Sequence, residues 1–119
     1  PVDLGPSLFM TFSQSLKAIL NDENVDALLH IFAVPQQPIK DFSLPITPHL
    51  REMSNLSTKL KKPVITCVFG SRWITEYFLQ HSYKYKIPIM AQISHAIKAL
   101  KFMYDFSISN KNLGNIPEI

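Results

Sequence analysis

The chain has 119 residues, 46% of them hydrophobic and 18% charged, which excludes a disordered chain and allows one small core. The single cysteine, Cys67, excludes an internal disulfide, and the Cys and His residues offer no set of zinc ligands. No apolar run approaches the roughly 20 residues that cross a bilayer. We therefore expect a globular domain in a reducing, cytoplasmic compartment, with no membrane contact and no metal site.

Glycine is scarce and proline abundant, with three glycines against nine prolines. Loops that hold phosphate through their backbone need glycine-rich turns, so the sequence predicts no such loop. The chain begins at Pro1 with no methionine and no apolar leader, and we expect a segment of a longer protein. Residues 107–119 are polar and aperiodic, which predicts a tail or linker.

The first half of the chain predicts two helices around a strand. Apolar spacings of three and four predict an amphipathic helix over residues 8–20, capped by Ser7. The nearly continuous apolar run of residues 25–34 is typical of a strand buried on both faces, and we expect a central parallel strand. A second helix is expected after the cap Thr47, with Pro48 at its first position and four apolar residues on one face, Leu50, Met53, Leu56 and Leu60.

Two further units of the same kind follow. Residues 63–69 are rich in β-branched side chains and predict a strand that ends in a turn at Gly70. A helix capped by Ser71 is expected to run to about Tyr83, and residues 87–91 predict a short strand.

The last predicted helix is capped by Ser94 and ends near Phe106. Its expected inner stripe is Ala96, Ile97, Leu100, Met103 and Tyr104. The alternation of helices and strands predicts an α/β fold, a three-layer parallel sheet with helices on its faces. Three strands, or four if residues 1–4 pair, are few for this class. We expect the open edge to be paired by a homodimer or by strands upstream in a parent chain.

Ligands of open parallel sheets bind beyond the carboxyl ends of the strands, where helix N-termini present unpaired N–H groups. The sequence places six candidates at this edge, Gln36, Gly70, Ser71, Arg72, Ser94 and His95. Gly70 to Arg72 is the best predicted anion site, because glycine allows close approach and arginine adds charge. The alternative is a tight turn before a capped helix. No catalytic residue is assigned, because no Ser-His-Asp or Cys-His arrangement can be assembled.

The net charge of +3 does not predict nucleic-acid binding. Five lysines fall at the C-terminal ends of predicted helices, where cations complement the helix dipole, namely Lys59, Lys61, Lys62, Lys84 and Lys86. Among the remaining titratable groups, we expect His30 and Cys67 to pack in strands, and His49 and His81 to lie at the surface.

Several segments in chain order resemble one family. They are residues 1–4 (PVDL), 24–32 (NVDALLHIF), 62–70 (KPVITCVFG), 86–90 (KIPIM) and 96–100 (AIKAL). They are similar to the "NPVDL", "VDAVLVIF", "KPVxAxxxG", "GIPVY" and "AVxAL" segments of the C-terminal flavodoxin-like domain of NDP-forming acyl-CoA synthetases, the succinyl-CoA synthetase-like group. The resemblance covers about residues 1–106.

The resemblance implies a partial flavodoxin-like domain over residues 1–106, taken from a ligase that interconverts acyl-CoA, NDP and phosphate with acid, CoA and NTP. The family's phosphohistidine belongs to an "SHTG" segment of another domain; Ala96 follows His95 here, so that role is not carried over. The family's glycine-rich "VTNGGG" strand would lie upstream of Pro1. The resemblance thus implies CoA and Mg-nucleotide sites in the parent enzyme only, with its other domains or subunits as partners.

Two other functions are compatible with the sequence. A non-catalytic interaction or regulatory module that kept the fold is suggested by residues 35–38 (PQQP), where a phosphate-facing turn would be expected. A metal-dependent phosphoacceptor domain is disfavoured, because no acidic cluster follows the first predicted strand.

Overall fold

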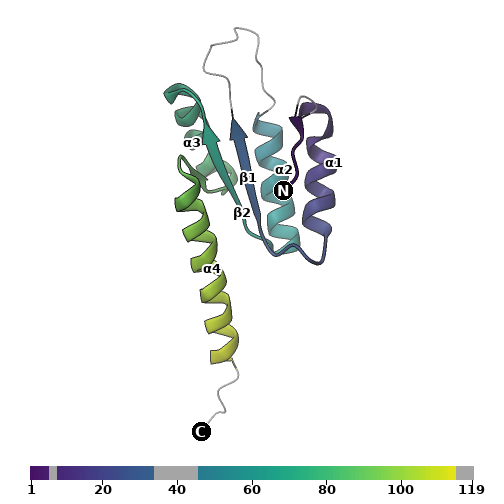
Figure 1. The fold of residues 1–119 in the computed structure, drawn as a ribbon, viewed down its shortest axis with the longest axis vertical. Coiled ribbons are helices and arrows are strands. Elements are labelled where there is room, and N and C mark those ends of the chain that lie inside the picture. The colour runs from purple at the N-terminus through teal and green to yellow at the C-terminus, as the bar shows by residue number, and fades with distance from the viewer. Residues whose placement is uncertain (6–7, 34–45, 115–119) are drawn as a thin grey trace.

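The computed structural model describes residues 1–5, 8–33 and 46–114. These residues form an α/β fold with a parallel sheet in the order β1-β2-β3 (Figure 1). The strands are β1 (Leu28–Ala33), β2 (Val64–Phe69) and β3 (Ile89–Met90). The helices are α1 (Leu8–Asn21), α2 (Ile46–Leu60), α3 (Arg72–Tyr85) and α4 (Ile93–Leu113). The predicted fold class is confirmed: the sheet is open, as in an incomplete flavodoxin-like domain.

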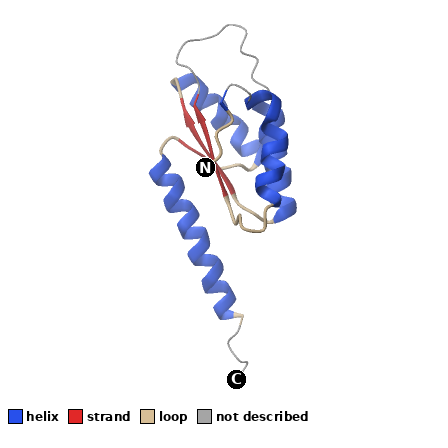
Figure 2. Ribbon diagram, turned by 45° about the vertical axis from the view of Figure 1, so that its right-hand side comes forward, coloured by secondary structure: helices blue, strands red, loops and turns tan. Residues whose placement is uncertain are grey.

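Helices lie on both faces of the sheet. Figure 2 shows α4 on the opposite side of the strands from α1 and α2. Buried residues of α1, α2 and α3 form the larger core against one face, among them Leu20, Leu50 and Phe78. A smaller core on the other face joins Ala96 of α4 to Ile65 and Cys67 of β2. None of the described helices is long and apolar enough to cross a membrane.

The central strand is β2, not the strand predicted to be central. Every residue of β2 except Phe69 is buried. In β1 only Phe32 is buried, and the side chain of Ile31 is 52% exposed. β1 pairs with β2 from Leu28 opposite Val64 to Ala33 opposite Phe69, and in this sheet it occupies one edge. The prediction was wrong because an apolar run does not encode which strands flank it.

The predicted fourth strand is not formed. Residues 1–4 have no regular structure, and the backbone turns back at Gly5, whose φ is +49° and whose N–H donates to Asp3 Oδ1 at 2.9 Å. The short strand expected over residues 87–91 is confirmed but contains only Ile89 and Met90.

The N-terminal caps differ in detail from the prediction. α2 begins at Ile46, so Thr47 lies inside the helix rather than at its cap. The N-cap of α4 is Gln92, so Ser94 also lies inside its helix. Ser71 is the N-cap of α3, as predicted. The predicted cap Ser7 lies outside the described residues.

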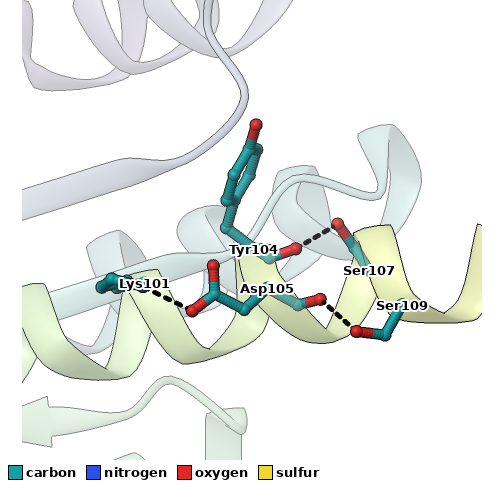
Figure 3. Close-up of polar contacts among 5 residues, drawn as sticks. All are labelled: Lys101, Tyr104, Asp105, Ser107 and Ser109. Carbon is teal, nitrogen blue, oxygen red and sulfur yellow. Dashed lines mark hydrogen bonds and ion pairs between the residues drawn. The ribbon is translucent and has the colours of Figure 1, made fainter.

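α4 continues to Leu113, seven residues beyond its predicted end near Phe106. Its serines are the reason: Ser107 Oγ donates to the carbonyl of Tyr104 at 2.8 Å, and Ser109 Oγ to that of Asp105 at 3.0 Å (Figure 3). These bonds satisfy the hydroxyls on the helix itself, so polar residues do not end it.

The inner stripe of α4 is narrower than predicted. Ala96 is buried, and Leu100 and Met103 pack against the smaller core. Ile97 and Tyr104, predicted on the same stripe, are exposed. The periodicity of α4 indicates two apolar flanks in addition to the face that the sheet covers.

Candidate functional site

The predicted ligand edge of the sheet lies where α3 and α4 begin. Because β2 and β3 are parallel, their carboxyl ends lie at the same edge, and the two helices begin there. This brings Gly70, Ser71 and Arg72 to the edge beside Ser94 and His95. Gln36, the sixth candidate, lies outside the described residues.

At the start of α3, the backbone of Ser71 accepts hydrogen bonds from the N–H groups of Ile74 at 3.1 Å and Thr75 at 3.2 Å. The Ser71 side chain makes no capping bond, and its Oγ is buried without a hydrogen-bond partner among the described residues. Ser71 therefore occupies the predicted N-cap position, but its hydroxyl accepts no hydrogen bond from the N–H groups of the first turn of α3.

The guanidinium of Arg72 forms an ion pair with a neighbouring side chain of α3. Its Nε donates to Glu76 Oε1 at 2.8 Å in an exposed pair one helical turn apart. This pair holds the guanidinium along α3, so it opposes the predicted role of Arg72 in an anion site. In this conformation the edge offers backbone N–H groups of α3, with no basic side chain shown to support them.

At the start of α4, the carbonyl of Gln92 accepts from the Ala96 N–H at 3.3 Å, and no side chain caps the helix. Ser94 and His95 are exposed on the first turn. No group of three or more His, Cys, Asp or Glu that could hold a metal occurs in the described residues. The edge thus lacks an assembled catalytic or metal constellation in the described part of the chain.

A cluster of polar and aromatic side chains lies between the sheet and the helices α1 and α2. The sequence did not indicate that these residues are in contact. His30 Nδ1 lies 3.3 Å from the Thr66 hydroxyl, across the β1–β2 pair. The Phe12 ring of α1 contacts His30 edge-on and stacks on His49 of α2, with ring centroids 4.1 Å apart. The expected surface position of His49 is wrong, because its ring is half-buried by this stacking.

Burial controls the ionisation of this cluster. Desolvation, and to a smaller extent the charge of His49, lowers the pKa of His30 to about 4. Desolvation also lowers the pKa of His49, against an opposing attraction from Glu52. Both imidazoles are therefore held toward the neutral form by the fold.

The same interface carries a polar link between the two helices. Ser13 Oγ of α1 donates to Glu52 Oε1 of α2 at 2.6 Å, and Lys17 Nζ lies 3.3 Å from the same oxygen. Since the Ser13–Glu52 contact joins positions 39 residues apart, periodicity alone could not have found it. We interpret the cluster as structural, because its contacts tie α1 to α2 and both α1 and β2 to β1.

Comparisons with protein-family models, curated proteins and solved structures found no match. The class of this protein is therefore defined by its fold alone: an α/β protein with an open three-stranded parallel sheet and helices on both faces, arranged as an incomplete flavodoxin-like domain.

Proposed function

We propose that this chain is part of the C-terminal flavodoxin-like domain of an NDP-forming acyl-CoA synthetase. The main support for the proposal is that the segments resembling the family's strands are strands in the structure. The segments similar to the family's strands form β1, β2 and β3, in the same order and in one parallel sheet. Short generic strands match a family easily one at a time, but three segments in order on one sheet are more specific.

In this proposal the parent enzyme converts acyl-CoA, NDP and phosphate into acid, CoA and NTP, through a phosphohistidine outside this chain. CoA and Mg-nucleotide are bound mainly by the rest of the enzyme. This chain contributes surface at the domain or subunit interface along the path of CoA and the phosphohistidine. It is inert alone, because the phosphohistidine and the sites for CoA and Mg-nucleotide lie in other parts of the parent enzyme.

The decisive experiment assays the complete natural protein that contains this segment. We expect it to form ATP or GTP from the corresponding diphosphate and phosphate in the presence of acyl-CoA, and to release CoA and acid in equal amounts. The 119-residue chain should show no turnover under the same conditions. As a matched control, His95→Gln in the complete protein should leave phosphorylation on histidine intact.

The outcomes separate the proposal from its alternatives. A complete protein with no nucleotide formation from a panel of acyl-CoA substrates would contradict the proposal. Loss of the phosphohistidine in the His95→Gln variant would show that the phosphorylated residue is in this chain, against the assignment.

A non-catalytic interaction module is the second candidate. It is supported by the apolar side chains that β1 and α4 expose, such as Ile31 and Phe102, since contiguous apolar surface marks interaction sites. The genomic sequence upstream of Pro1 distinguishes the two candidates. A glycine-rich strand and turn upstream of Pro1 favours the ligase, and a start codon directly before Pro1 favours the module.

A further inference from the structure

On the face of the sheet that carries α4, the helix covers β2 but leaves β1 exposed. Leu100 and Met103 of α4 pack against the small core of β2. On β1, by contrast, Ile31 is 52% exposed although it lies in a strand. Figure 1 shows α4 beside β2, with no described helix over β1 on that side. A parallel sheet is normally covered on both faces, so half a layer is missing here.

The second half of α4 extends beyond the sheet, and no other described helix or strand lies beside it (Figure 1). Along the whole of α4, large apolar side chains are exposed on two flanks. One flank carries Phe102, Phe106 and Leu113, and the other carries Ile97, Tyr104 and Ile108. Phe102 is 72% exposed and Phe106 59%.

The charged side chains in the middle of α4 gather on the remaining side. Lys101 and Asp105 form an ion pair one turn apart, 2.5 Å between Nζ and Oδ2 (Figure 3), and Lys98 precedes them on the same side by helical spacing. With the inner stripe included, apolar residues occupy roughly two thirds of the circumference of α4 over residues 96–106. A helix of this kind is typical of burial on several sides, not of a solvated tail.

We propose that two copies of this chain associate through their α4 helices in antiparallel orientation. The projecting half of each helix then lies beside the partner's α4 and over the bare half of the partner's sheet. Each copy thus supplies the half layer that the other lacks. A two-fold arrangement of this kind is closed, because the same patch is used on both copies.

The exposed area is sufficient for such a dimer. A large apolar side chain buries about 150–250 Å², so the flank of Phe102, Phe106 and Leu113 that faces the partner's α4 exposes on the order of 350 Å² per copy. Ile31 and Phe69 of each sheet add about 150 Å² per copy, and burial in both copies gives on the order of 1,000 Å², at the lower limit for specific interfaces. This inference does not depend on the proposed ligase function.

The test is the mass of the 119-residue chain in solution, measured by light scattering and sedimentation over a range of concentrations. We expect twice the monomer mass of 13.6 kDa. The double variant Phe102→Ser and Phe106→Ser should weaken association about tenfold or more, the usual effect of removing buried aromatic anchors. Ile31→Thr, which keeps a β-branched side chain in β1, should weaken it as well.

The control is Tyr83→Ser on α3, since Tyr83 is even more exposed, at 88%, and lies on a helix outside the proposed interface. It should dimerise like the unchanged chain, and far-UV circular dichroism should show all variants folded. A monomer at every concentration overturns the proposal. So does a dimer that the α4 variants leave intact, which would indicate pairing through the edge of β1, and so do open-ended aggregates.

Discussion

At the scale of single residues, the described part of the fold buries few polar side chains, and Thr66 is one that has a defined partner. Thr66 is fully buried in β2, and its hydroxyl meets the imidazole of His30. Cys67, its neighbour, is also fully buried, and burial raises the pKa of its thiol. The predicted packing role of Cys67 is therefore confirmed, and the thiol has the character of an inert core residue.

We expect His30 to make the chain acid-sensitive. The pKa of His30 is about 4 in the folded chain, against an ordinary value of 6.5. Above pH 6.5, His30 is neutral in both the folded and the unfolded chain, and the fold keeps its full stability. As pH falls from 6.5 toward 4, the unfolded chain takes up the proton first, so the free energy of unfolding decreases. The loss from His30 alone is on the order of 3 kcal/mol. Urea titrations between pH 7 and about 4 measure it.

The His30→Phe variant isolates this effect. His49 lies close enough to share it, since Phe12 contacts both rings, and Glu52 opposes the shift of His49. The variant should therefore show a shallower but not flat dependence of stability on pH in this range. His95→Gln, at an exposed position, is the control. Equal pH dependence in His30→Phe and the unchanged chain would refute the assignment.

At the scale of elements, lysines hold the ends of helices in place, as their positions in the sequence predict. Lys59 and Lys84 lie in the last turns of α2 and α3. Lys86 is the C-cap of α3, with a left-handed backbone at φ 55°, and Lys61 after α2 has the same φ. Lys62 also connects two elements, because its Nζ donates to backbone carbonyls at the C-terminal end of α1.

Removal of the Lys62 ammonium should loosen the junction of α1 and β2. Its Nζ donates to the carbonyls of Leu20 at 2.8 Å and Asp22 at 2.7 Å, at the end of α1. Lys62→Met leaves these carbonyls without that donor, and we expect unfolding to become easier by about 1–3 kcal/mol. Denaturant midpoints at constant m-value measure the change.

Lys61→Met is the matched control, because Lys61 is adjacent, carries the same charge and is exposed. Its effect should stay within about 0.5 kcal/mol, as for other surface substitutions. If both variants lose equal stability, the effect comes from the net charge or from the turn, and the two hydrogen bonds of Lys62 are not its source.

At the scale of the whole molecule, the two faces of the sheet are unequal. The large core on the face of α1, α2 and α3 contains most of the buried side chains, whereas the core under α4 contains three buried residues, Ile65, Cys67 and Ala96. The ligand edge at the starts of α3 and α4 has no assembled set of charged groups among the described residues.

We therefore expect CoA, ATP and phosphate to give little thermal stabilisation of the 119-residue chain. A ligand stabilises a fold only in proportion to its occupancy of the native state, and the edge offers few groups that would hold an anion. Differential scanning fluorimetry with each compound at millimolar concentration measures this. A shift of several degrees with CoA would contradict the prediction and would indicate a site at Gly70 to Arg72.

Arg72→Gln then serves to locate any such site. If CoA does stabilise the chain, loss of the shift in this variant would place the anion at the start of α3. In the absence of ligand, the variant loses only an exposed ion pair with Glu76, so its own melting temperature should change little.

The order and type of the elements were predictable from the sequence by itself. The spacing of Phe12, Leu16 and Leu20 encodes the buried face of α1, and the run of β-branched residues from Val64 encodes β2. These signals are local, because the repeat of a helix or strand is set by its own backbone geometry.

Only the tertiary structure decided which strand is central and what buries the His49 ring. Each depends on contacts between segments far apart in the chain: β1 is at an edge because β2 alone pairs with it in the described sheet, and His49 is half-buried because Phe12 of another helix stacks on it. The exposed flanks of α4 are the clearest case. Their apolar pattern is written in the sequence, but the sheet is too narrow to cover them, and that width is set by tertiary pairing.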